Sequence, residues 1–173
     1  MPANDTIRSL TVADIRFRFE TTGTGEDANN PEPHYSNPYV TIETSSGGGV
    51  GIGFTLGRGN ELVCRAVDEL APLVVGRTVT ELVDDFALTW RMLANPLQSR
   101  WIAPGAGPYH MAAGAITNAL FDAWARDRGV PLWRALAALE PEALVRMLDF
   151  RYVEHLLTRD EALTTLAEHE PTS

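Results

Sequence analysis

Residues 39–56, YVTIETSSGGGVGIGFTL, contain two short runs rich in valine, isoleucine and threonine on either side of a serine- and glycine-rich turn. Glycine adopts positive φ angles at no steric cost, so this stretch predicts a hairpin of two antiparallel strands, residues 39–44 and 50–56. Upstream, residues 10–19 alternate apolar and polar side chains, with a shift of phase at Ala13-Asp14. The alternation predicts a further half-buried strand that contains a β-bulge.

Beyond the hairpin the apolar residues recur with a helical period. Asn60 is placed to cap a first helix, and Thr78 with Glu81 forms a capping box that predicts a second helix as far as Asn95. We expect the later helices at residues 109–128, 131–139 and 141–148, and from Thr158 onward. The small residues at 112–115 predict that a neighbouring helix approaches the third helix closely. Strands followed by helices indicate an α+β fold, a three-stranded antiparallel meander followed by a helical bundle.

Length and composition exclude several classes of protein. The chain has 173 residues, which suits one domain with an attached element, whereas a complete (β/α)₈ barrel needs about 250 residues. Its net charge of −9 disfavours binding to nucleic acid or to a membrane surface. All 14 basic residues are arginine, so the chain offers no lysine for proton abstraction or Schiff-base chemistry. With one cysteine and no long apolar run, we expect a cytoplasmic protein without disulfides.

Few residues form a recognisable catalytic pattern. The glycine stretches at 47–53 and 57–59 match no phosphate-binding motif, and the four histidines lack the spacing of a zinc site. Cys64 lies on a mostly apolar helix face, where we expect a buried inert thiol. Residues 21–37 form a long polar loop that could hydrogen-bond a small polyhydroxylated ligand, with a disordered tether as the alternative.

Seven strings in this order resemble the enolase superfamily, in its mandelate racemase and muconate-lactonizing branch, and within that branch the L-fuconate dehydratase family. They are DANNPEPHY at 27–35, FTLGRGNE at 54–61, QSRWIAPGAG at 98–107, NALFDAWAR at 118–126, GVPLWRAL at 129–136, DFRY at 149–152 and LTRDEAL at 157–163. The resemblance implies that residues 1–140 form the N-terminal capping domain. It also implies that residues 141–173 form linker helices leading to a barrel that this chain lacks.

The resemblance also implies a reaction. Enzymes of this family abstract the proton α to a sugar-acid carboxylate, stabilise the enolate on Mg²⁺ and expel the β-hydroxyl as water, giving a 2-keto-3-deoxy acid. In the family the bases and metal ligands belong to the barrel, so we expect no cofactor, no metal ligand and no catalytic residue in this chain. The capping domain closes over the substrate and excludes water.

Carried over residue by residue, the resemblance places the sugar acid against five residues: Gly25, Glu26, Asp27, Tyr35 and Arg58. Two departures from the family pattern could change which sugar acid is accepted. Glu26 stands where a small residue is expected, and His34 stands where an acidic residue precedes the tyrosine.

The leading interpretation is therefore the capping domain of an L-fuconate dehydratase-like enzyme, truncated before its barrel and inactive alone. The alternative is a free-standing module that binds sugar acids or docks on another protein. Linker helices without their barrel would leave apolar side chains uncovered and predict contact with a barrel domain or self-association. These side chains are Leu144, Leu148, Phe150, Tyr152, Leu156 and Leu157.

Overall fold

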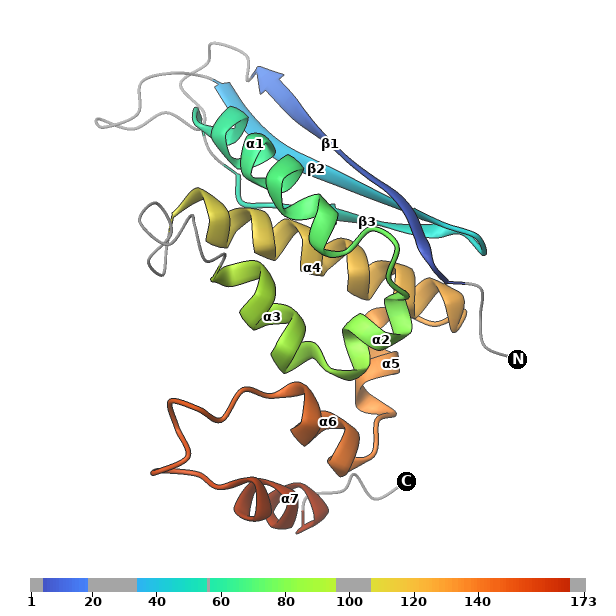
Figure 1. The fold of residues 1–173 in the computed structure, drawn as a ribbon, viewed down its shortest axis with the longest axis vertical. Coiled ribbons are helices and arrows are strands. Elements are labelled where there is room, and N and C mark those ends of the chain that lie inside the picture. The colour runs from blue at the N-terminus through green and yellow to red at the C-terminus, as the bar shows by residue number, and fades with distance from the viewer. Residues whose placement is uncertain (1–4, 19–33, 56, 96–106, 169–173) are drawn as a thin grey trace.

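The computed structural model describes residues 5–18, 34–55, 57–95 and 107–168. Three strands come first along the chain and helices follow (Figure 1). The strands are β1 (Ile7–Arg18), β2 (His34–Thr44) and β3 (Gly48–Ile52). The helices are α1 (Asn60–Leu70), the short 3₁₀ helix η1 (Ala71–Leu73), α2 (Val79–Asp84), α3 (Phe86–Ala94), α4 (Pro108–Asp127), α5 (Leu132–Ala137), α6 (Pro141–Met147) and α7 (Arg159–Glu168). The predicted α+β class, an antiparallel meander followed by helices, is confirmed.

The sheet has the order β1-β2-β3, with both pairs antiparallel. β2 begins at His34, five residues before the strand predicted at Tyr39, because its pairing with β1 continues through polar residues that carry no hydrophobic signal.

The bulge predicted at Ala13-Asp14 is wrong, since pairing runs unbroken from Ser9 to Arg18 and the register shift lies between Ile7 and Ser9. The apparent change of phase arises because Ile15 and Phe17 are apolar side chains on the exposed outer face.

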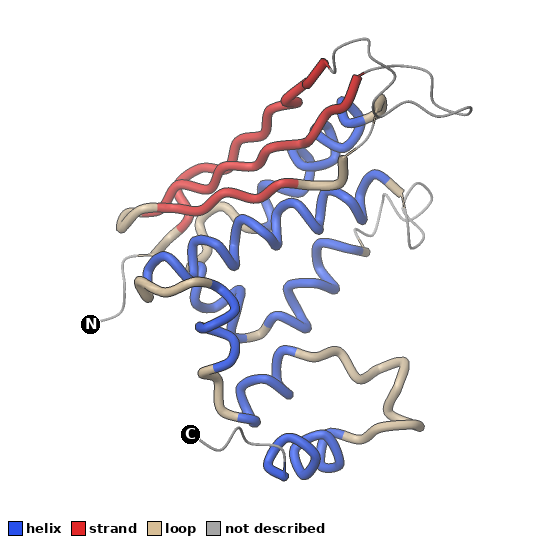
Figure 2. Tube along the Cα trace, turned by 180° about the vertical axis from the view of Figure 1, so that it is seen from behind, coloured by secondary structure: helices blue, strands red, loops and turns tan. Residues whose placement is uncertain are grey.

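Helix α4 lies directly against β3, and two glycines allow this contact (Figures 1 and 2). A Cβ atom at Gly49 would lie 2.2 Å from the backbone oxygen of Ala119, and one at Gly51 would lie 2.1 Å from that of Ala115. The small residues of α4 were expected to admit a neighbouring helix, but their tightest approach is to this strand. Gly114 takes no part in it, because a Cβ there would meet nothing within 4 Å.

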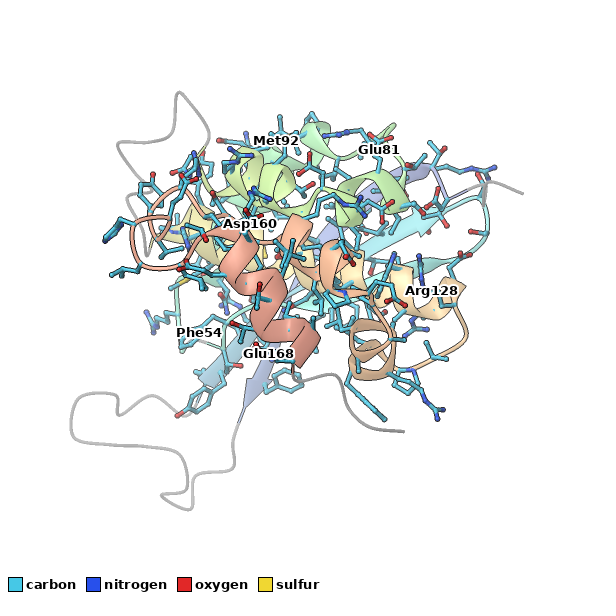
Figure 3. All side chains as sticks on the ribbon, turned by 90° about the horizontal axis from the view of Figure 1, so that it is seen from below. Phe54, Glu81, Met92, Arg128, Asp160 and Glu168 are labelled. Carbon is cyan, nitrogen blue, oxygen red and sulfur yellow. The ribbon has the colours of Figure 1, made fainter. Side chains whose placement is uncertain are left out.

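The region predicted as one helix from Thr78 to Asn95 forms two, α2 and α3. Asp85 interrupts them with non-helical angles of φ −114° and ψ 59°, and its carboxylate accepts the Leu88 N–H at 3.3 Å as the N-cap of α3. The predicted capping box is confirmed: Thr78 Oγ1 accepts the Glu81 N–H at 3.2 Å. Figure 3 labels Glu81 and Met92 on these two helices, where the Arg77 guanidinium contacts both side chains.

The C-terminal helices have a small core of their own. Val145, Phe150 and Ala162 form a small buried cluster, distinct from the main core, which lies between the sheet and the helices and includes Met147 of α6. The prediction that apolar residues of this region are uncovered is confirmed in part. Tyr152 is 78% exposed and Leu156 is 77% exposed, whereas Phe150 is buried. Figures 1 and 2 show α6 and α7 at the end of the molecule away from the sheet.

Candidate functional site

An open pocket of about 570 Å³ lies where the end of β1 and the start of β2 meet the loop before α1. Antiparallel pairing sets Phe17 opposite Tyr35, and the chain returns from β3 to place Arg58 beside them. The pocket is lined by Arg16, Phe17, His34, Tyr35, Gly57, Arg58 and Glu61. Two predicted site residues, Tyr35 and Arg58, are therefore brought together, while Gly25, Glu26 and Asp27 fall outside the described residues.

Asn60 anchors the loop that carries Arg58. This residue was expected to cap α1, but it is the first helical residue and is fully buried. Its Nδ2 donates to the Ser36 backbone oxygen at 2.6 Å, to Ser36 Oγ at 3.0 Å and to the Phe54 oxygen at 3.3 Å. The Asn60 side chain thus joins the start of α1 to β2 and to the segment after β3.

Gly59 takes the N-cap position instead. Its φ of 102° lies in the left-handed region, where a side chain would be strained. Its N–H donates to Glu61 Oε2 at 3.2 Å, so a carboxylate in the first turn holds the backbone just before the helix. The conformation of the loop is therefore set by a glycine, a buried amide and one carboxylate.

Charged side chains around the pocket form a short network. Arg16 donates from Nε to Asp14 Oδ2 at 2.7 Å, and its Nη2 lies 2.7 Å from the same oxygen and 3.4 Å from Glu61 Oε2. Backbone hydrogen bonds from its own N–H and from that of Gly59, with the Arg16 and Arg58 guanidinium groups, lower the pKa of Glu61. The hydrogen bond and charge of Asp14 raise the pKa of Arg16. Both side chains are ionised at neutral pH.

Sequence reasoning missed Arg16 and Glu61. Arg16 lies in the alternating pattern of a strand, and Glu61 is an acidic residue in the first turn of a helix, which is common because it suits the helix dipole. Glu61 does lie in the string FTLGRGNE that carries the resemblance, which is the one signal that could have singled it out.

The other described residues offer little support for catalysis or metal binding. Within the described ranges, no group of three or more histidine, cysteine, aspartate or glutamate side chains could hold a metal ion. Cys64 is partly buried rather than enclosed, and burial followed by the charge of nearby carboxylates raises the pKa of its thiol. A thiol kept protonated at neutral pH is a poor nucleophile, in line with the inert role expected. Among the described helices, none is long and apolar enough to cross a bilayer.

A three-stranded antiparallel sheet followed by helices, with a polar pocket at one end of the sheet, is the architecture of an enolase-type capping domain. The crystal structure of human mitochondrial enolase superfamily member 1 matches it with a TM-score of 0.87 and 41% identity, over 95% of this chain and 38% of that one. Residues 33–136 match the family described as mandelate racemase / muconate lactonizing enzyme, N-terminal domain. The chain belongs to this family.

Two curated relatives extend the similarity beyond the family match. L-galactonate dehydratase of Hypocrea jecorina is 42% identical over 166 residues, 95% of this chain and 37% of the relative. Human mitochondrial enolase superfamily member 1 is 42% identical over 163 residues, 92% of this chain and 37% of the relative. The chain thus spans little more than a third of the length of these relatives.

A more distant structure shares the fold alone. L-talarate dehydratase of Polaromonas sp. JS666, in a complex with Mg and L-glucarate, matches with a TM-score of 0.59 and 21% identity. The match covers 79% of this chain and 33% of that one. Magnesium and a sugar acid are thus bound by a protein with the same N-terminal architecture.

Proposed function

We propose that this chain is the substrate-covering domain of a sugar-acid dehydratase. The observation that carries the proposal is the open pocket in which Tyr35 and Arg58, predicted to touch the substrate, come together from β2 and the loop before α1. A phenol and a guanidinium supply hydrogen bonds suited to the hydroxyl and carboxylate oxygens of a sugar acid. The name of the fungal relative, L-galactonate dehydratase, supports the same substrate class.

The role of the chain is to bind and enclose. The proposed reaction removes the proton α to the carboxylate and expels the β-hydroxyl as water, leaving a 2-keto-3-deoxy acid. The chain contains no lysine to act as a base, and among its described residues no cluster of histidine, cysteine, aspartate or glutamate could hold a metal ion. The contribution of its own residues is to orient the substrate and to exclude water from it.

The substrate we propose has the L-galacto configuration. L-galactonate, in the name of the fungal relative, and L-fuconate, implied by the sequence resemblance, differ only at C6, which carries a hydroxyl in the first and a hydrogen in the second. The charged Arg16 and the apolar Phe17 line the same pocket, which supports acceptance of either terminal group.

A hybrid enzyme tests this proposal. The segment of H. jecorina L-galactonate dehydratase that aligns with this chain would be replaced by it, and formation of the 2-keto-3-deoxy acid measured. We expect the hybrid to dehydrate L-galactonate or L-fuconate, and Arg58→Ala to lower kcat/KM about tenfold or more through a lost charged hydrogen bond. A hybrid that folds, assembles and turns over neither acid would refute the proposal. Arg134→Ala, far along the chain on α5, serves as the matched control.

A second candidate is an interaction module, favoured by the exposed apolar side chains Leu148, Tyr152 and Leu156. Such a surface predicts self-association or docking on a barrel domain. Light scattering on the purified chain tests the predicted self-association. A chain that stays monomeric at high concentration counts against self-association through these residues.

A further inference from the structure

Among the described residues, partners hold the guanidinium of Arg16 along one edge. Its Nε and Nη2 both face Asp14 Oδ2, and Nη2 also faces Glu61. Within the part of the chain that the structure describes, Nη1 donates to no acceptor. The Arg16 side chain lines the same pocket as Tyr35 and Arg58 and is 64% exposed. The two N–H groups of Nη1 are hydrogen-bond donors that no described residue uses.

The two carboxylates are themselves fixed in place. Asp14 sits within the paired part of β1, opposite Pro38, and its side chain is only 18% exposed. Glu61 is tied to the Gly59 N–H at the start of α1. Arginine normally loses much rotamer freedom when it binds a ligand, and here the fold has already restricted that freedom.

Stability of the fold does not account for this arrangement. Exposed ion pairs contribute little to the free energy of folding, because solvent screens them and two long side chains lose entropy. Arg16 of β1 and Glu61 of α1 instead line an open pocket together with Arg58, and such a group of charged side chains is typical of a binding site. Two carboxylates, Asp14 and Glu61, balance two guanidinium groups, Arg16 and Arg58, so the pocket suits a ligand with hydroxyl groups rather than a multiply charged anion.

We propose that Arg16 binds the sugar acid through its Nη1 edge and that Asp14 and Glu61 are its positioning residues. The inference rests on the proposed function and adds a substrate-binding residue to it. The Nη1 edge donates to a hydroxyl or carboxylate oxygen of the ligand. Asp14 sets the plane of the guanidinium, and Glu61 links it to the loop that carries Arg58.

The test uses the full 173-residue chain with L-galactonate and L-fuconate as probes, with affinities from calorimetry and the arginine Nε–Hε signals followed by NMR. We expect Arg16→Ala to weaken binding of at least one acid about tenfold to a hundredfold, the range for a hydrogen bond to a charged group. Arg8→Ala removes the same charge from the far end of β1 and should change the affinity less than about twofold. Equal affinities for Arg16→Ala and the wild type would overturn the assignment.

The positioning role has its own test. Glu61→Gln keeps an acceptor for the Gly59 N–H but removes the charge that faces Arg16, so we expect a weaker affinity and a displaced Arg16 Nε–Hε signal in a chain that remains folded. Asp68→Asn, the same change of charge on the exposed side of α1, is the control and should alter neither. An unmoved signal and affinity in Glu61→Gln would overturn the role of Glu61.

The two proposals fail separately. A wild-type chain that binds neither acid overturns a ligand site at Arg16 in this chain, whereas the proposed function depends on turnover by the hybrid enzyme. A hybrid that is active and insensitive to Arg16→Ala retains the function and removes Arg16 from it.

Discussion

The two ends of the sheet are built differently. At the end near the β2-β3 turn, Asp5 is buried and its Oδ2 accepts the Thr80 N–H at 2.7 Å and the Thr80 hydroxyl at 2.6 Å. The Ile7 N–H donates to Arg77, and the Gly76 N–H returns a bond to Ile7. At the other end, the exposed charged side chains of Arg16 and Glu61 line an open pocket. One end of the sheet is therefore bonded to the helices, whereas polar side chains line an open pocket at the other.

The largest loss of stability is expected where β3 meets α4. Gly51→Ala would drive a Cβ against the backbone oxygen of Ala115, which cannot move without shifting the helix, and should cost about 3 kcal/mol. Gly114→Ala is the matched control, because its Cβ enters open space in a helix interior and should stabilise the protein by about 0.5–1 kcal/mol. Urea unfolding measures both. Equal effects would mean that α4 does not pack on β3 as described.

The next largest loss of stability is expected at the end of the sheet near the β2-β3 turn. Asp5→Ala removes the acceptor of the Thr80 N–H and hydroxyl in a buried setting, and we expect a loss of about 2 kcal/mol with no change in sugar-acid affinity. Asp127→Ala, an exposed carboxylate near the same end, should be close to neutral. A variant at Asp5 that lost ligand affinity but not stability would reverse the comparison between the ends.

The capping box gives a smaller effect. Thr78→Ala removes the oxygen that accepts the Glu81 N–H and should cost about 1 kcal/mol, measured as a lower urea midpoint. Thr78→Ser keeps the hydroxyl and should stay near the wild type. If both variants behaved alike, the hydroxyl would not be the stabilising group.

Acid should weaken the fold through carboxylates whose pKa is lowered. The hydrogen bond from Arg77, with those from Thr78, lowers the pKa of Glu81, and hydrogen bonds from Thr158 lower that of Glu161. A lowered pKa in the folded state means that the stabilisation is present above the ordinary value and is lost as pH falls through the folded value. Glu81→Gln should therefore flatten the decline of Tm below about pH 4.5. A slope equal to that of the wild type would contradict this.

The smallest effect on stability is expected at the pocket end. Arg16→Ala should leave the Tm unchanged within error, since its guanidinium is exposed and its ion pairs are screened. A large fall in Tm would show that the network fastens the sheet as the other end does, and the contrast between the two ends would disappear.

Local signals predicted the elements well and their junctions poorly. The hairpin, the capping box at Thr78 and the long helix α4 follow from periodicity and turn chemistry within a few residues of the chain. Asn60 shows the limit: its place before a helical pattern indicated a cap, but burial beneath β2 gave its amide other partners. The sequence pattern indicates a turn glycine at Gly49 and a strand glycine at Gly51. Glycine is required at both positions because the backbone of α4, more than 60 residues away, leaves no room for a side chain.

The residues of the pocket were also predicted only in part. Tyr35 and Arg58 were predicted through the resemblance, and the structure brings them into one pocket. Arg16 and Glu61 lie 45 residues apart, and no local pattern relates them.

The α+β order of elements, the family and the lack of lysine can be read from the chain alone, because they depend on residue types and on periods of two or 3.6 residues. Which polar groups bond the sheet to the helices and which line the pocket depends on contacts between distant residues. Whether a carboxylate stabilises the fold or orients a neighbouring side chain depends on what burial and strand register place beside it, and that information exists only in three dimensions.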